Sequence, residues 1–197
     1  MTRCATNPGA HPATRNGDGG DSLALARDQT GEAGGILAGP GEVVVRAARM
    51  EDVRKIYALL QFFAGRNLLL ARPLSSLYDH LRDFKVALSV GADSGEVLGV
   101  CALHICWENL AEIRSLAVVE NVHGRGVGRT LVRSCLDNAR DLGISRVFTL
   151  TYQPEFFKKM GFSPIDKSEL PHKVWSDCIN CPMFPDCNEE SLIWESA

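Results

Sequence analysis

The alternation of strand-like and helix-like patterns along the 197 residues predicts an α/β domain, built on one mixed β-sheet with helices on both faces. Three strand patterns follow one another between residues 84 and 119, which indicates an antiparallel meander. A glycine-rich turn and an amphipathic helix come next, at residues 120–142, and a further strand pattern covers residues 146–151. Strands joined through a helix pair in parallel. We therefore expect one domain whose sheet contains both kinds of pairing.

The strand, turn and helix between Leu116 and Leu142 form the most informative stretch. Leu116–Val119 is a short apolar run typical of a buried strand, and His123–Gly128 is rich in glycine. The first N–H groups of a helix have no partner inside the helix, and that end carries partial positive charge. Because glycines let a phosphate approach these groups, we expect a pyrophosphate-binding loop. A tight turn that only caps a helix is the simpler alternative. The helix has an apolar face formed by Val127, Leu131, Cys135, Ala139 and Leu142.

The remaining elements follow from hydrophobic periodicity and from turn residues. Pro73 disfavours helix at the residue before it, and Ser75 is a suitable N-cap for the helix that follows. The predicted strands are 43–47, 84–90, 96–106, 111–119, 146–151 and 190–194, and the predicted helices are 51–64, 75–82, 127–142 and 154–160.

Residues 1–42 are expected to be a disordered tail, and residues 43–197 the folded domain. The tail contains half of the eighteen glycines, three of the nine prolines and none of the aromatic residues. Such a segment cannot bury enough apolar surface to offset its chain entropy. An organelle transit peptide is the alternative, but Asp18, Asp21, Asp28 and Glu32 oppose it because such peptides avoid acidic residues.

Charge and cysteine content restrict the partners and the compartment. A net charge of −3 and a pI near 6.0 argue against nucleic acid as a main partner. No apolar run approaches the roughly 20 residues that cross a bilayer, so no membrane partner is expected. The N-terminus lacks the apolar segment of a signal peptide, which favours a reducing, cytoplasmic setting. Three of the seven cysteines, Cys101, Cys106 and Cys135, lie in apolar patterns and are expected to be reduced core residues. Association into a homo-oligomer stays open.

The loop excludes two other phosphate-binding motifs and resembles a third. No Gly-Lys-Ser/Thr ending is present, and no acidic residue follows at the spacing of a dinucleotide-binding fold. The spacing His123-x-x-Gly126-x-Gly128 resembles the acetyl-CoA loop of the GNAT acetyltransferase superfamily, with histidine in place of the usual glutamine or arginine. The order of elements from about residue 43 to 195 is similar to the GNAT fold as well. The resemblance implies acetyl-CoA as co-substrate, bound by Leu116, Ala117, Val118, His123, Gly124, Arg125, Gly126, Val127, Gly128 and Arg129.

Acetyl transfer from a thioester to an amine requires a base, an oxyanion donor and a leaving thiol. Glu112 stands on the strand before the loop and matches the glutamate that many GNAT enzymes use as a base, although a salt-bridging strand glutamate is the alternative. A backbone N–H near Leu116 or Ala117 is the expected oxyanion donor. The family commonly has a tyrosine where this chain has Phe157, so Thr151 and Tyr152 are the candidate hydroxyls for the leaving thiolate. Tyr152 as a simple core or rim tyrosine is the alternative.

A narrower resemblance covers the C-terminal third. Residues 147–157, Gly161-Phe162 and 167–171 are similar to the GNAT domain of N-acetylglutamate synthases, above all to their short, stand-alone bacterial form. The resemblance implies L-glutamate as acceptor, in the first step of arginine biosynthesis. Arginine suits the two carboxylates of glutamate. The resemblance points to Arg72 and Lys173 as substrate-binding residues, and Arg114 would share the strand face of Glu112. A solvated surface charge is the alternative for each.

The pattern Cys178-x-x-Cys181-x5-Cys187 could be part of a metal site, with His172 as a further ligand. Tetrahedral sites usually show two ligand pairs, and this stretch has one, so reduced structural cysteines and no metal centre are expected. Two rivals to a glutamate acetyltransferase remain. One is a GNAT enzyme for another small amine or a protein N-terminus, and the other is a non-catalytic sensor of acetyl-CoA or metal.

Overall fold

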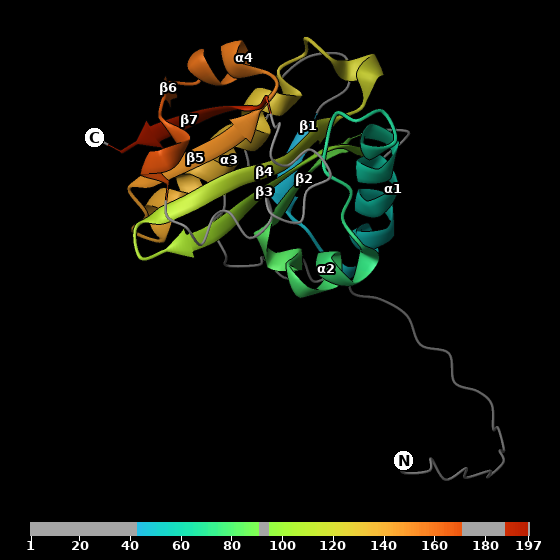
Figure 1. The fold of residues 1–197 in the computed structure, drawn as a ribbon. Helices are drawn as coiled ribbons and strands as arrows, with labels where there is room; N and C mark the ends of the chain where they lie inside the picture. Colours follow the sequence, from blue (N-terminus) through green and yellow to red (C-terminus); the bar gives the residue numbers. More distant parts are fainter. Residues whose placement is uncertain (1–42, 91–94, 171–187, 197) are drawn as a thin grey trace, which may run out of the picture. The chain divides into compact units, whose positions relative to one another are not determined.

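The structure, a computed structural model, describes residues 43–90, 95–170 and 188–196. The strands of this part form one mixed sheet in the order β1-β2-β3-β4-β5-β7-β6, as Figure 1 shows. Only β4 and β5 pair in parallel, which confirms the predicted mixed sheet. The strands are β1 (Val43–Ala47), β2 (Phe84–Ser89), β3 (Val97–Trp107), β4 (Leu110–Val118), β5 (Arg146–Thr151), β6 (Ser163–Pro164) and β7 (Glu190–Glu195).

Helices cover both faces of this sheet. Along β3, Cys101 packs in the cluster that contains Leu131 of α3, and the next residue, Ala102, packs in the cluster that contains Ile56 of α1. Successive residues of a strand point to opposite faces, so α3 and α1 lie on opposite sides. No helix within the described ranges is long and apolar enough to cross a lipid bilayer. The α-helices are α1 (Val53–Ala64), α2 (Leu74–Asp79), α3 (Val127–Asp141) and α4 (Pro154–Lys158), and the 3₁₀ turns are η1 (Met50–Asp52), η2 (Leu81–Asp83), η3 (Glu120–Val122) and η4 (Lys167–Glu169).

The second helix differs from its prediction at both ends. Pro73, and not Ser75, is its N-cap, and the helix stops at His80 before η2 turns the chain into β2. The fixed φ of proline suits the residue that leads into a helix, and here Pro73 is extended at φ −66° and ψ 150°. Leu142, predicted on the buried face of α3, lies just past the helix end and is exposed.

Two irregularities in β4 shape the centre of the sheet. Its ladder to β5 covers only residues 110–112, so the two strands have no described pairing beyond Glu112. On its other edge, Val100 pairs with Ala117 and Ala102 with Arg114. Two residues of β4, Ser115 and Leu116, therefore face one residue of β3, which is a β-bulge, and Ser115 has a φ of +54°.

The cysteines of the described core are reduced. Cys101, Cys106 and Cys135 are free thiols, and Cys101 and Cys135 are fully buried while Cys106 is half-buried. A hydrogen bond with Cys135, together with burial, raises the pKa of the Cys101 thiol well above its ordinary value. The Cys101 thiol therefore stays protonated and unreactive inside the sheet–α3 interface.

Candidate active site

The glycine loop brings unpaired backbone amides to one point at the start of α3. Gly124 and Gly126 adopt left-handed φ angles of +76° and +85°, and Gly126 is the N-cap of α3. The amide of Thr130 donates to the carbonyl of Gly126 at 3.0 Å. Among the described residues, no backbone hydrogen bond is donated by the amides of residues 126–129. Amides at the positive end of a 15-residue helix that have no backbone partner within the described ranges can bind an anion such as a pyrophosphate.

The side chain of His123 ties this loop to the end of β4. Its Nε2 lies 2.7 Å from the carbonyl oxygen of Val118, so Nε2 carries the proton and donates it. The histidine that replaces the more common glutamine or arginine thus makes an internal contact. Arg125 and Arg129 are exposed beside the free amides and add positive charge to the loop.

The backbone ladder between β4 and β5 ends at Glu112. We call the stretch beyond it, where the two strands have no described pairing, the gap between β4 and β5. Thr149 of β5 donates its hydroxyl proton to the carbonyl of Ile113 at 3.0 Å, which joins the two strands where the ladder stops. The bulge at Ser115–Leu116 lies on the same part of β4, and only the end of β4 and η3 separate it from the glycine loop.

Glu112 and Arg114 share one face of β4, as their spacing predicts. The Oε2 atom of Glu112 lies 3.8 Å from a guanidinium nitrogen of Arg114, and their side chains are 16% and 10% exposed. The ion pair that sequence reasoning offered as an alternative to catalysis is therefore present, although it is long. A long pair leaves the carboxylate able to contact another group.

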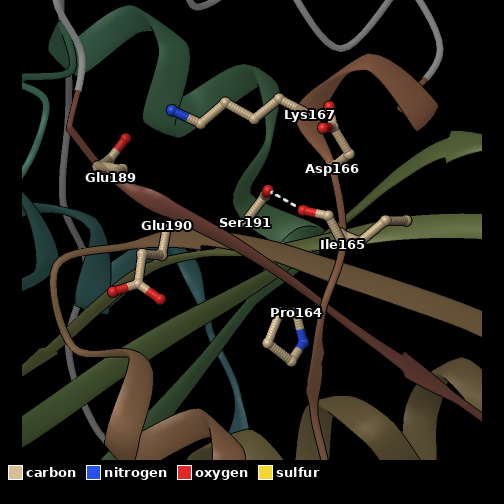
Figure 2. Close-up of a pocket in the computed structure, with 7 residues that line it drawn as sticks. All are labelled: Pro164, Ile165, Asp166, Lys167, Glu189, Glu190 and Ser191. Carbon is tan, nitrogen blue, oxygen red and sulfur yellow. Dashed lines mark hydrogen bonds between the residues drawn. The ribbon is translucent and has the colours of Figure 1, made fainter.

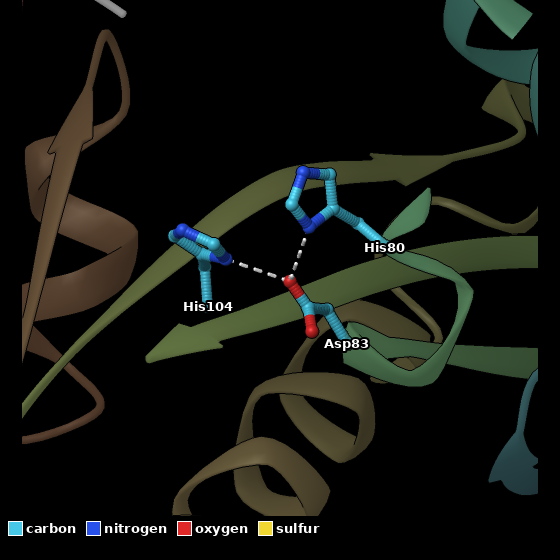
Figure 3. Close-up of side chains that lie close together, drawn as sticks. All are labelled: His80, Asp83 and His104. Carbon is cyan, nitrogen blue, oxygen red and sulfur yellow. Dashed lines mark hydrogen bonds and ion pairs between the residues drawn. The ribbon is translucent and has the colours of Figure 1, made fainter. Parts of the chain in front are cut away.

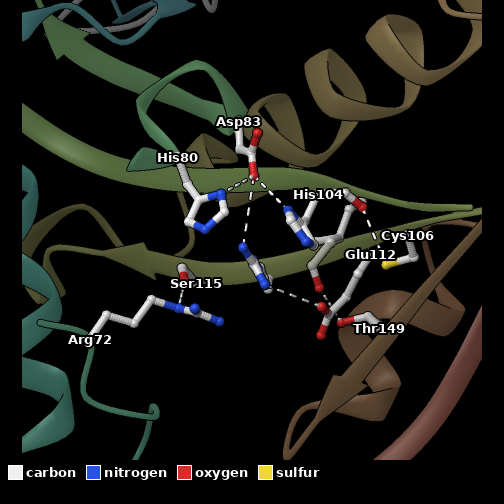
Figure 4. Close-up of polar contacts among 10 residues, drawn as sticks. Arg72, His80, Asp83, His104, Cys106, Glu112, Ser115 and Thr149 are labelled. Atoms are coloured by element: carbon white, nitrogen blue, oxygen red, sulfur yellow. Dashed lines mark hydrogen bonds and ion pairs between the residues drawn. The ribbon is translucent and has the colours of Figure 1, made fainter. Parts of the chain in front are cut away.

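Arg72 reaches the same strand from the loop between α1 and α2. Its Nε donates to the hydroxyl of Ser115 at 3.2 Å, as Figure 4 shows, and Gln61 of α1 donates to the Arg72 carbonyl at 3.2 Å. The structure therefore brings together Arg72, Arg114 and Glu112, three residues that the sequence singled out. Lys173 and the cysteine group Cys178, Cys181 and Cys187 lie outside the described residues.

The candidate hydroxyl groups have different surroundings. Thr151 is buried, and its oxygen accepts a hydrogen bond from the amide of Gln153 at 2.9 Å. Tyr152 is 37% exposed at the end of β5. Phe157, which stands where the family commonly has tyrosine, packs edge-to-face against Phe156 and Phe162 in the core. Of the candidates, Tyr152 is the more exposed residue.

A histidine–aspartate group beside this site was not predicted from the sequence. His104 Nδ1 lies 2.8 Å from Asp83 Oδ2, and His80 Nδ1 lies 3.8 Å from the same oxygen (Figure 3). A guanidinium nitrogen of Arg114 lies 3.7 Å from this oxygen, so the group is connected to Glu112 through Arg114. The His80-x-x-Asp83 spacing was the only local signal in the sequence, and nothing local linked it to His104.

A separate pocket of about 370 Å³ lies between η4 and β7 (Figure 2). No residue that the sequence singled out as a functional residue lines it. Asp166, Glu189 and Glu190 contribute carboxylates and Lys167 contributes one ammonium group, which makes the pocket a poor receptor for an anionic substrate.

Comparison with known proteins identifies the family. The Acetyltransferase (GNAT) family pattern matches residues 51–162. An uncharacterized N-acetyltransferase from Chlorobaculum tepidum is 38% identical over 77% of this chain and 96% of its own length. An amino-acid acetyltransferase from Mycobacterium tuberculosis is 40% identical over 68% of this chain and 76% of its own length.

A solved structure extends this likeness. The N-acetylglutamate synthase from Neisseria gonorrhoeae, complexed with coenzyme A and N-acetyl-glutamate, has a TM-score of 0.69 and 28% identity. The match covers 78% of this chain and 35% of that one. Further solved neighbours also hold coenzyme A. The chain therefore belongs to the GNAT family of acetyltransferases, and its co-substrate is acetyl-CoA.

Proposed function

We propose that the protein transfers the acetyl group of acetyl-CoA to the α-amine of L-glutamate, the first step of arginine biosynthesis. The observation that carries this proposal is the meeting of Arg72 and Arg114 with Glu112 on β4, beside the gap between β4 and β5. Two guanidinium groups suit an acceptor with two carboxylates, and a carboxylate beside them suits the removal of a proton from its ammonium group. The relatives named amino-acid acetyltransferase support the same class of acceptor.

The first steps concern acetyl-CoA. Its pyrophosphate binds the free amides of residues 126–129, and its arm lies along the gap so that the thioester reaches the bulge. There an amide of Leu116 or Ala117 donates to the carbonyl oxygen as that oxygen becomes an oxyanion. The bulge supports this assignment, because a bulge takes residues out of the regular ladder.

The next steps concern the amine. Glu112 removes a proton from the ammonium group, directly or through a water molecule, and the free amine attacks the thioester carbonyl. The nitrogen of the tetrahedral intermediate then gives its extra proton to solvent, and the intermediate collapses by breaking the carbon–sulfur bond, which releases CoA as a thiolate and leaves the neutral amide. Tyr152 or Thr151 protonates the thiolate, although a thiol with an ordinary pKa of about 8.5 leaves readily without help.

Substrate specificity then rests on the cations. Arg72 and Arg114 bind the carboxylates of glutamate, and Lys173 is a third candidate. Because Arg72 comes from a loop and not from β4, it can be removed without changing the strand that holds the base.

A thiol-release assay with acetyl-CoA and each of the twenty amino acids tests the acceptor. Glutamate should give the highest kcat/KM. Arg72→Ala should raise the KM for glutamate about 10- to 100-fold, because a hydrogen bond to a charged group contributes about 1.5–3 kcal/mol. Arg54→Ala, which removes an exposed arginine of α1, is the matched control and should leave this KM unchanged.

Two results would overturn the assignment. Turnover only with other amines would make the protein a GNAT enzyme for a different acceptor. Binding of CoA without turnover of any amino acid would indicate a sensor of acetyl-CoA.

A further inference from the structure

We propose that His80, Asp83 and His104 form a binding site for a divalent first-row transition-metal ion, with zinc as the best match. We call these three residues the His–Asp–His group. Their ligand atoms all lie within 4.8 Å of one another, and they are the candidate metal group within the described part of the chain. The proposal goes beyond acetyl transfer, because that reaction requires no metal.

Local structure fixes two of the ligands. The amide of Asp83 donates to the carbonyl of His80 at 3.0 Å, which closes a 3₁₀-type turn at η2. Side chains three residues apart in such a turn lie above one another, so His80 and Asp83 face the same way. His104 reaches them from β3, and its ring is perpendicular to that of His80 with 5.2 Å between the centroids. The two rings therefore lie on different sides of one carboxylate oxygen (Figure 3).

The distances are close to those of an occupied site. With zinc–ligand bonds of about 2.0–2.2 Å, the ligand atoms of a tetrahedral ion lie roughly 3.3 Å apart. The Asp83 Oδ2 to His104 Nδ1 distance of 2.8 Å would have to open by about 0.5 Å, and the 3.8 Å distance to His80 Nδ1 would have to shorten by about as much. His80 has the freedom to move, because its side chain is 41% exposed.

The donor set selects the class of ion. Two imidazole nitrogens and one carboxylate oxygen suit zinc and its first-row neighbours, whereas calcium and magnesium prefer oxygen ligands. Three protein ligands leave a fourth position for water or an added ligand, and the exposed side of His80 provides access to it.

The site is coupled to the proposed acceptor pocket through Arg114. Asp83 Oδ2 accepts from His104 and also lies 3.7 Å from Arg114, whose other nitrogen lies 3.8 Å from Glu112. A metal ion bound to this oxygen would take Asp83 away from Arg114 and repel the guanidinium group. Metal binding and the placement of Arg114 therefore oppose each other.

Cobalt(II) titration, followed by its visible d–d absorption, tests the site directly. The full chain should carry Cys178→Ser, Cys181→Ser and Cys187→Ser, because this cysteine pattern also attracts soft metals. In that background cobalt should bind one equivalent, and zinc should displace it. Loss of an outer-shell partner weakens metal binding about 10- to 100-fold. His80→Ala or His104→Ala removes a ligand itself and should therefore weaken cobalt binding by more than this. His11→Ala is the matched control and should keep full affinity.

Cobalt binding by the Arg114→Gln variant distinguishes a metal site that is coupled to Arg114 from a chance cluster of side chains. Loss of the opposing cation should strengthen cobalt binding, while far-ultraviolet circular dichroism shows that the variant is folded. Cobalt affinity that is unchanged in His80→Ala and His104→Ala, or weaker in Arg114→Gln, would overturn the proposal. A cobalt spectrum that depends only on the three cysteines would overturn it too.

A kinetic readout rests on the proposed function. Zinc should raise the KM for glutamate without changing the KM for acetyl-CoA, and His80→Ala should remove this effect. If glutamate is not the acceptor, the kinetic effect fails while the cobalt spectrum remains. If the His–Asp–His group does not bind metal, the cobalt spectrum is absent while glutamate turnover is intact. The two failures are therefore distinguishable.

Discussion

Glu112 combines an observed structural contact with the chemical task that we propose for it. Its carboxylate lies 3.8 Å from Arg114, and its backbone pairs with His104 on β3 and with Phe148 on β5. It is also the last residue of the ladder to β5, which places its side chain at the beginning of the gap. Sequence reasoning could identify Glu112 because a glutamate just before a glycine loop has a family precedent, and the two-residue spacing placed Arg114 on the same strand face, but the distance between the two charged groups could not be predicted.

Glu112→Gln should lower kcat by about 10²–10⁴-fold, the usual loss when a general base is removed. Glutamine keeps the shape of the side chain, so the KM for acetyl-CoA should stay the same. The defect should become smaller as pH rises, because more of the amine then arrives without its proton. Steady-state kinetics between pH 7 and 10 measure this, with Glu108→Gln in the exposed turn after β3 as the control. Near-normal turnover at pH 7 would leave Glu112 as a salt-bridge partner only.

Asp52 illustrates a purely structural residue. It is 2% exposed and accepts two hydrogen bonds from Arg46, at 2.7 and 3.1 Å, and one from the amide of Arg49 at 2.7 Å. Burial raises the pKa of Asp52, but the hydrogen bonds from Arg46 and Arg49 and the nearby positive charges outweigh it, so the pKa is lowered. The ionised carboxylate therefore joins β1 to the start of α1.

Asp52→Asn should lower the free energy of unfolding at pH 7 by about 2–3 kcal/mol, the contribution of hydrogen bonds to a charged group. A lowered folded-state pKa adds stability above the ordinary aspartate pKa of about 3.9, and this stability is lost as pH falls through the folded value. Urea denaturation at several pH values should show a constant difference above pH 5 that closes below pH 4. Asp79→Asn, which changes an exposed aspartate of α2, should show no such difference.

At the scale of elements, we expect α3 and its loop to have the most direct effect on acetyl-CoA binding. Gly126 and Gly143 flank opposite ends of this helix and have similar left-handed φ angles, +85° and +74°. An alanine at either position suffers the same kind of backbone strain. Only the substitution at Gly126 alters the amides at the positive end of the helix.

Gly126→Ala should therefore raise the KM for acetyl-CoA, whereas Gly143→Ala should leave it unchanged at a similar cost in stability. Gly128→Val should also raise it: a Cβ at Gly128 would already be in contact with Phe156 at 3.6 Å and with Val118 at 3.7 Å, so the two further methyl groups of valine must displace these neighbours or the start of α3. Acetyl-CoA titrations and thermal unfolding measure both effects. Equal acetyl-CoA affinity in all three variants would remove the basis for placing the pyrophosphate here.

Elements with a clear hydrophobic periodicity could be predicted from the sequence, and irregular elements could not. The apolar spacing of α1 and α3 and the strand patterns from β2 to β5 were recognisable, since packing against one core imposes a period on each. β6 consists of Ser163 and Pro164, which is too short to show any period. The bulge at Ser115 depends on the register with β3, and register is set by the partner strand and cannot be read from β4 alone.

At the scale of the whole molecule, the candidate site consists of residues from distant parts of the chain. Arg72 comes from a loop, Glu112 and Arg114 from β4, and the His–Asp–His group from η2 and β3. The family resemblance indicated Arg72 and Glu112, and the strand spacing indicated Arg114. The link of Asp83 to His104, 21 residues apart, depends on tertiary packing that no local pattern records.

The start of β1 at Val43 leads to a prediction about the whole chain. β1 starts at Val43 and pairs with β2 from its first residue, and the hydrophobic clusters of the described part begin there. Deletion of residues 1–40 should therefore leave kcat, both KM values and the thermal unfolding midpoint nearly unchanged. Steady-state kinetics and calorimetry check this, and loss of activity in a folded truncated chain would give the N-terminal segment a functional role.

The gap between β4 and β5 has a consequence for the amount of folded protein. Strand edges with open N–H and C=O groups attract another extended chain, and the pantetheine arm of coenzyme A is extended and carries amide groups of its own. The extended arm of the co-substrate would then take the place of the strand pairing that β4 and β5 lack beyond Glu112. A ligand that binds only the native state stabilises it by about 2.7 kcal/mol at a hundred times its Kd. A cell with little acetyl-CoA would therefore contain fewer folded enzyme molecules, and each of them would turn over more slowly.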